Sequence, residues 1–138
     1  MSDHFTLRFH TATTTERLKR RARSAGVKPS PLASRYVEEG LRQDDHPHVR
    51  FVSGPSGRRA AIIGTGLDVW EIIATVRDND NDVAEAASYL SVPVGVVDAA
   101  VTYYGEFRDE IDAEIAANRE EAERAHAAWQ AGQQALAQ

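Results

Sequence analysis

The side chains best suited to recognition chemistry lie near the N-terminus, where polar and apolar residues alternate. In an extended chain Phe5, Leu7 and Phe9 share one face, because successive side chains of a strand point to opposite sides. The opposite face presents hydrogen-bonding groups at a spacing suited to base edges in a DNA major groove. This face carries His4, Thr6, Arg8 and His10, and Thr6 and Arg8 are predicted to face the groove.

Two helices are predicted to position this strand, at about residues 14–25 and 31–41, with Gly26 between them. Ser30 is the predicted cap of the second helix. A single amphipathic strand can neither cover its apolar face nor pair its own backbone. We therefore expect two copies to pair antiparallel, in a dimeric head formed by residues 1–45.

This N-terminal pattern resembles the ribbon-helix-helix repressors, the Arc/MetJ-like fold found in many antitoxins. In that family the outward strand side chains touch base edges, and the start of the second helix binds a phosphate. The resemblance implies base contacts by His4, Thr6 and Arg8 and a phosphate contact by Ser30. The residues that carry it are Phe5-x-Leu7-Arg8-Phe9, Gly26, Ser30-Pro31-Leu32-Ala33 and Tyr36-Val37-Glu38-Glu39-Gly40-Leu41.

Charge is distributed unevenly along the 138 residues, whose formal net charge is −5. Residues 1–59 hold 12 Lys/Arg against 6 Asp/Glu, whereas residues 60–138 hold 4 against 15. Five basic residues, Arg20 among them, fall in the first predicted helix and would attract the DNA backbone whatever its sequence. The acidic part is expected to meet a different partner. The alternative is two ordinary surfaces that happen to differ.

Residues 46–105 predict a β-hairpin followed by a helix-turn-helix-like unit. Two strand-like runs flank the turn sequence Gly54-Pro55-Ser56-Gly57. Helices are expected after the capping residue Asp68, after Asn81 or Asp82, and from about residue 94. The last of these offers no Arg, Lys, Asn or Gln to a base edge, so a structural or protein-binding role is expected.

Residues 49–115 are similar to a small antitoxin domain whose members accompany PIN-like toxins, in the manner of VapB proteins. The resemblance implies a type II antitoxin that neutralises a PIN-like ribonuclease and represses its own operon as a DNA-bound dimer. Many members carry an arginine after Gly-Thr, where this chain has Gly66. The motifs that carry it are Gly57-Arg58-Arg59-Ala60-Ala61, Gly64-Thr65-Gly66, Asp68-Val69-Trp70-Glu71, Tyr103-Tyr104 and Asp109-Glu110-Ile111-Asp112.

Residues 106–138 predict an acidic helical tail with 8 Asp/Glu against 3 Arg. Apolar residues recur there at steps of three and four, interrupted at Arg108 and Asn118, and Gly105 is the expected weak point before the tail. Few are bulky, so we expect the tail to fold on a toxin partner. It would fill a basic RNA cleft, or its arginines would enter a carboxylate-rich metal site. The predicted toxin-binding residues are Arg108, Ile111, Ile115, Arg119, Arg124 and Trp129.

Together these features predict a mainly α fold with short β. Its expected parts are the ribbon-helix-helix head, the hairpin with a helix-turn-helix-like unit, and the long C-terminal helix. The chain has no cysteine, signal peptide or long apolar run, so we expect a cytoplasmic protein. No catalytic constellation, metal site or cofactor is predicted. The alternative function is a stand-alone ribbon-helix-helix transcriptional regulator without a toxin partner.

Overall fold

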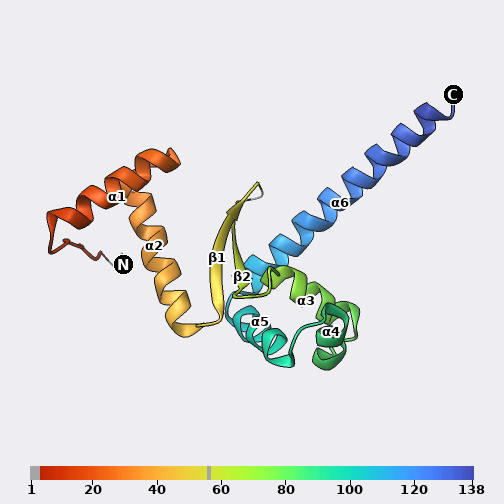
Figure 1. Cartoon of the computed structure of the whole chain (residues 1–138), viewed down its shortest axis with the longest axis horizontal. Coiled ribbons are helices and arrows are strands. Elements are labelled where there is room, and N and C mark those ends of the chain that lie inside the picture. The colour runs from red at the N-terminus through yellow and green to blue at the C-terminus, as the bar shows by residue number, and fades with distance from the viewer. Residues whose placement is uncertain (1–3, 56) are drawn as a thin grey trace. The chain divides into compact units, whose positions relative to one another are not determined.

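The computed structural model describes residues 4–55 and 57–138 (Figure 1). The chain forms two units, an N-terminal unit, Met1–Asp45, and a C-terminal unit, His46–Gln138. The N-terminal unit contains α1 (Ala12–Ala25) and α2 (Pro29–Asp45). The C-terminal unit contains β1 (Val49–Gly54), β2 (Gly57–Ile62), α3 (Val69–Asp78), α4 (Val83–Leu90), α5 (Val94–Glu106) and α6 (Arg108–Leu136).

The predicted N-terminal strand is absent, so the prediction of a ribbon-helix-helix head was wrong. Residues 4–9 have no regular secondary structure, and helices precede both strands of the described chain. Phe5 and Leu7 are 87% and 53% exposed, so the alternating pattern forms no buried face. A strand needs a second strand to satisfy its backbone, and β1 and β2 already pair with each other in the C-terminal unit.

Local signals define the two helices of the N-terminal unit. The Thr14 backbone N–H donates to the Thr11 side chain at 3.4 Å at the start of α1, as expected of an N-terminal cap. Gly26 ends α1 in the left-handed conformation, with φ 67°. Only Ala22 and Leu32 are buried among the described residues of this unit. The two helices therefore form a very small core.

The C-terminal unit is built on an antiparallel hairpin in which Val49 pairs with Ile62 and Gly54 with Gly57. Its inner side meets α3 and α5, and α4 packs against both of these helices. The start of α6 joins the same core through α3 and α5. The largest fully buried side chains of this unit are Tyr103, Ile62, Ile72, Ile111, Val49, Val69 and Val97.

Asp68 connects the hairpin to the start of α3. Its carboxylate accepts hydrogen bonds from Arg59 Nε at 2.5 Å and from Trp70 Nε1 at 3.1 Å. The Glu71 side chain in turn accepts from the Asp68 backbone N–H at 3.1 Å. Asp68 is 8% exposed, and a charge so buried needs partners of this kind. These bonds fix β2 against α3.

The chain bends twice around α5. Asp82 caps α4 by accepting from the Glu85 backbone N–H at 3.1 Å, and Ser91 ends α4 in the left-handed conformation. The second bend falls at Phe107, two residues after the glycine that was expected to be the weak point. The Phe107 ring packs on Tyr103 there, with centroids 4.6 Å apart. In the described chain no single helix is long and apolar enough to cross a membrane. Only α4 and α5 taken together, bent by 120°, reach that length and composition.

Candidate functional site

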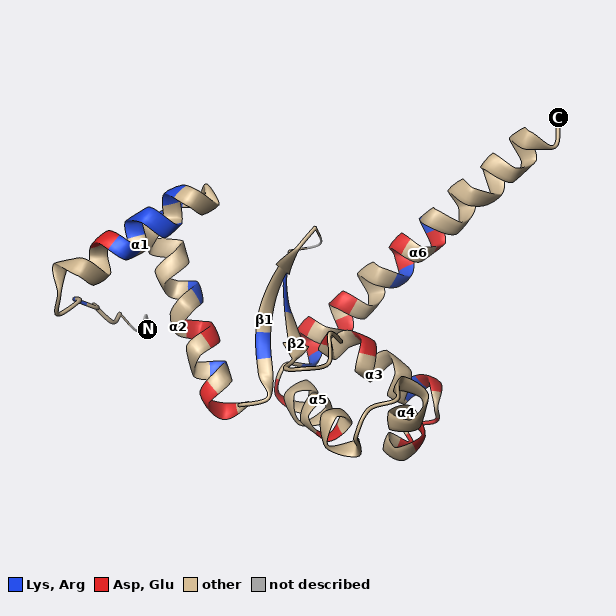
Figure 2. Ribbon diagram, in the orientation of Figure 1, with Lys and Arg blue, Asp and Glu red and all other residues tan. Residues whose placement is uncertain are grey.

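The first candidate surface is the basic side of α1. Its five basic residues are all exposed, and Figure 2 shows them clustered along this helix. Since 3.6 residues make one turn, those three and four apart share one side of the helix. Such a cluster attracts phosphate groups whatever the base sequence. The five are Arg17, Lys19, Arg20, Arg21 and Arg23.

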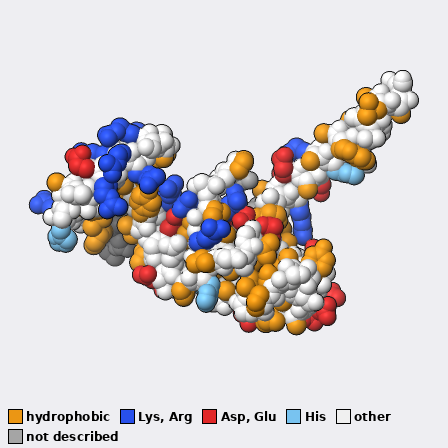
Figure 3. Space-filling model, in the orientation of Figure 1, with side chains coloured by type: hydrophobic (Ala, Val, Ile, Leu, Met, Phe, Trp, Pro, Cys, Tyr) orange, Lys and Arg blue, Asp and Glu red, His pale blue; other side chains and the backbone are white. Residues whose placement is uncertain are grey.

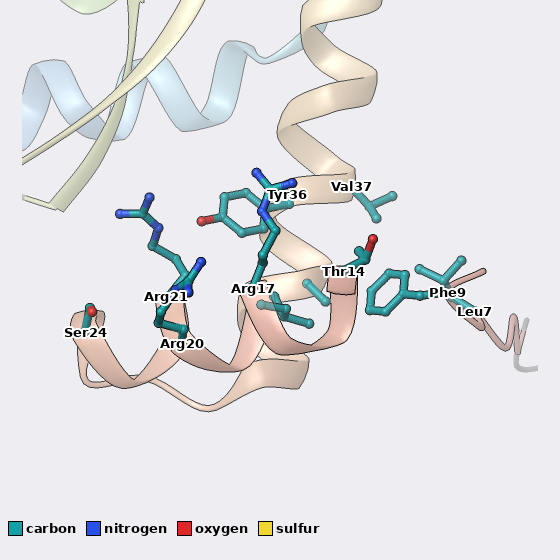
Figure 4. A pocket seen from close by; sticks show the side chains of 11 residues that line it. Leu7, Phe9, Thr14, Arg17, Arg20, Arg21, Ser24, Tyr36 and Val37 are labelled. Atoms are coloured by element: carbon teal, nitrogen blue, oxygen red, sulfur yellow. The ribbon is translucent and has the colours of Figure 1, made fainter. Parts of the chain in front are cut away.

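An apolar groove of about 610 Å³ lies beside this basic side, within the N-terminal unit (Figure 4). It is formed by the N-terminal segment, α1 and α2. Three of the α1 arginines also line it, so an apolar surface with a basic edge results. The apolar lining residues are Leu7, Phe9, Leu18, Ala33, Tyr36 and Val37, and the arginines are Arg17, Arg20 and Arg21.

The structure separates the residues predicted to contact DNA. His4, Thr6 and Arg8 are exposed on the irregular N-terminal segment, where no strand aligns them on one face. Ser30 is exposed in the first turn of α2, inside the helix rather than before it. Arg20 alone joins a cluster, together with its basic neighbours on α1. Contact of these residues with DNA stays a prediction.

The second candidate surface is α6, whose two ends differ sharply. Ile111 and Ile115 are 0% and 3% exposed and belong to the core of the C-terminal unit. They were predicted to contact a toxin, but their side chains are already covered by this chain. From residue 119 to residue 138 every residue is exposed, and Figure 3 shows hydrophobic side chains spaced along this distal part.

The other predicted toxin contacts are accessible. Trp129 is 61% exposed. Its indole stacks on the His126 ring, with ring centroids 6.2 Å apart. Arg124 pairs with Glu121 at 3.1 Å, and Arg108 lies 3.7 Å from Asp112. Exposed pairs of this kind contribute little to stability, so both arginines can exchange partners easily. Arg119 is exposed as well.

A polar cluster that the sequence did not reveal holds the start of α6. Arg77 Nη2 and Tyr104 Oη donate to Asp112 Oδ1 at 2.6 and 2.7 Å, and Arg77 also donates to Tyr104. The pKa of Asp112 lies below its usual range because Tyr104 and then Arg77 donate hydrogen bonds to its carboxylate. The pKa of Arg77 is raised, chiefly by the same bond to Asp112. The cluster joins α3, α5 and α6.

A second polar contact closes the core beside the α5–α6 junction. The His46 ring is 8% exposed, and its Nε2 lies 2.7 Å from Glu106 Oε2. The ring meets Tyr103 edge-on with centroids 5.1 Å apart. The structure gives His46 a packing role at the first residue of its unit.

Two surfaces of opposite character therefore stand out, a basic α1 beside an apolar groove and a long uncovered α6. No family model, curated protein or solved structure matches the chain. Function is inferred from these surfaces and from the sequence motifs.

Proposed function

We propose that the protein is an antitoxin of a type II toxin–antitoxin pair. Its N-terminal unit binds operator DNA, and its C-terminal helix holds a PIN-like ribonuclease. The observation that carries the proposal is the uncovered distal part of α6, where 20 consecutive residues from 119 to 138 are exposed. A helix in a protein gains most of its stability from packing against other elements. The distal part of α6 lacks such packing within its own unit, so a partner that covers it would stabilise it.

The basic side of α1 supports DNA binding. Five exposed basic residues on 14 residues of helix give a local positive field, with Glu16 as the only acidic residue of α1. Phosphate contacts by such residues release counterions, so binding weakens with salt. The operator-bound form is proposed to be a dimer, because Tyr36, Val37 and Leu41 of α2 remain exposed and the unit buries so little by itself.

The distal part of α6 supports protein binding. Trp129 and Leu136, at 61% and 82% exposure, are large apolar side chains of the kind that anchor interfaces. Arg119 and Arg124 are exposed and can approach a carboxylate-rich nuclease site, since both lie beyond the part of α6 that its own unit covers. Ile111 and Ile115 are excluded from this contact set by their burial.

The structure also indicates where the deciding truncation belongs. Removing residues 106–138 would delete two core side chains, whereas removing residues 119–138 deletes only exposed ones. The shorter truncation is expected to keep operator binding in a gel shift and to lose capture of the PIN-like nuclease encoded beside it. A truncated protein that still captures the nuclease with full affinity contradicts the antitoxin proposal.

DNA binding is tested separately with a matched pair of exposed arginines. Arg20→Ala is expected to weaken binding to all DNA sequences and to lower the slope of log affinity against log salt by about one unit. Arg124→Ala, which removes the same side chain from the acidic α6, should leave both unchanged. Equal effects of the two variants would show that α1 has no special part in DNA binding.

A second candidate is a DNA-binding regulator without a toxin. The heptad-like spacing of the apolar residues on the exposed part of α6 favours it, because such spacing also suits self-association. A neighbouring reading frame that encodes no nuclease, together with intact operator binding, would favour this candidate.

A further inference from the structure

One face of α6 carries a heptad-spaced stripe that changes surroundings part-way along the helix. Ile111 and Ile115, at its start, are buried in the core of the C-terminal unit. The stripe then continues at alternating steps of three and four residues, which keeps it on one face of the helix. Its later members are half-buried at Asn118 and exposed beyond it. They are Asn118, Ala122, Ala125, Trp129, Gly132 and Leu136.

We propose that this stripe pairs with the same stripe of a second copy, in an antiparallel two-stranded coil. The pairing does not depend on the antitoxin proposal, because it concerns the protein alone. Continuity is its first support, since the face that its own unit covers at one end is the face left uncovered at the other. Asn118 fits the stripe because its side-chain amide already donates to the Glu114 carbonyl at 2.8 Å.

The position of the core selects the antiparallel direction. Because Ile111 and Ile115 pack into the core, the rest of the unit lies on the stripe side at the start of α6. A parallel second helix would need the space that this core occupies. An antiparallel helix avoids it, because its own core then lies beyond the C-terminal end of the first helix. The overlap runs from residue 118 to residue 136.

Side-chain sizes also favour the antiparallel pair. Matching the ends of the stripe places Asn118 opposite Leu136, Ala122 opposite Gly132, and Ala125 opposite Trp129. Each indole then faces a small side chain, with room for close packing. A parallel pair in register would place Trp129 against Trp129 and Gly132 against Gly132, so the helices could not keep an even separation.

The distribution of charge along α6 also favours the antiparallel pair. Residues 108–124 carry 7 Asp/Glu and 3 Arg, whereas residues 125–138 carry none of the four charged types. An antiparallel pair sets each acidic segment beside an uncharged one. A parallel pair brings the two acidic segments together, which is unfavourable.

His126 lies near the centre of the antiparallel pair, beside its counterpart. If Trp129 also anchors a nuclease, pairing and capture compete, and this last consequence alone rests on the proposed function.

The absence of cysteine allows a direct test in the full-length chain. Asn118→Cys and Leu136→Cys proteins are mixed, equilibrated and oxidised mildly, and the linked peptides are identified by mass spectrometry. The antiparallel pair brings residue 118 of one copy beside residue 136 of the other. Two copies of Leu136→Cys alone would hold their thiols about 27 Å apart at 1.5 Å per residue, beyond reach of a disulfide.

The yield of the 118–136 disulfide in the mixture is expected to be on the order of tenfold higher than the yield of the 118–118 or 136–136 disulfide from either variant alone, because of that distance limit. Adding Trp129→Ala should lower this yield several-fold while leaving the circular dichroism of the core intact. The matched control is Ala127→Cys, on the opposite face of α6, which should link poorly. Efficient linking of Leu136→Cys alone, or a mixed yield no higher than that of Ala127→Cys, would overturn the proposal.

Discussion

Replacement of Ile111 by alanine measures whether α6 begins as part of the core or as a free tail. Ile111 is 0% exposed and lies among the core residues of the C-terminal unit. The change removes three carbon atoms, worth roughly 2.4 kcal/mol at about 0.8 kcal/mol each. The cavity left behind adds to this, so the total expected loss of stability is about 2–5 kcal/mol.

The matched control is Ile63→Ala, since Ile63 is 54% exposed. The same chemical change there is expected to alter the free energy of unfolding by less than about 0.5 kcal/mol. Urea denaturation, followed by circular dichroism and by Trp70 fluorescence in a Trp129→Phe background, compares the two variants. Trp70 is a suitable probe because its indole N–H donates to Asp68 inside the unit.

Comparable losses for the two variants, or a loss below about 1 kcal/mol for Ile111→Ala, would refute the buried position of Ile111. The same variant also separates core from interface. With the Ile111→Ala protein still folded at low temperature, its affinity for a nuclease partner should stay close to that of the unchanged chain. A large loss of affinity without a loss of stability would indicate that Ile111 contacts the nuclease.

Three further changes test the contacts around α6 and α4. The folded-state pKa of Asp112 is lowered, so the stability that its carboxylate contributes is present above the unfolded pKa of about 3.9 and is lost as the pH falls through the folded pKa. Asp112→Asn should therefore be less stable than the unchanged chain at pH 7. Urea denaturation should show this difference in stability shrinking below about pH 4. His46→Ala should cost about 1–3 kcal/mol in the same assay, because it removes a buried ring and the hydrogen-bond partner of Glu106. Ser91→Gly should raise stability by about 0.5–1 kcal/mol, because Ser91 has φ 58°, where glycine is unstrained; unchanged or lower thermal stability would contradict this.

The sequence by itself determined the elements that depend on neighbours along the chain. The two strands predicted on either side of the turn sequence pair as β1 and β2, and Asp68 and Asp82 each precede a helix. Gly26 ends α1 in the left-handed conformation that favours glycine. These signals succeed because a cap or a tight turn is satisfied by atoms within a few residues.

The N-terminal strand was predicted wrongly because its formation depends on a partner that is distant in the chain. The alternation from Phe5 to Phe9 is real, but a strand forms only when a second strand supplies its hydrogen bonds. The alternation predicts which side chains would share a face of a strand, but it does not predict whether a second strand is available to pair with it. For that reason His4, Thr6 and Arg8 lie on an irregular segment.

Only the tertiary structure decided which part of α6 is core and which part is surface. Ile115 and Trp129 belong to one stripe with one period, yet they are 3% and 61% exposed. The difference arises because α3 reaches the start of α6, where Arg77 from α3 and Tyr104 from α5 hold Asp112. Periodicity fixes the direction in which a side chain points, whereas burial depends on what the rest of the chain places in front of it.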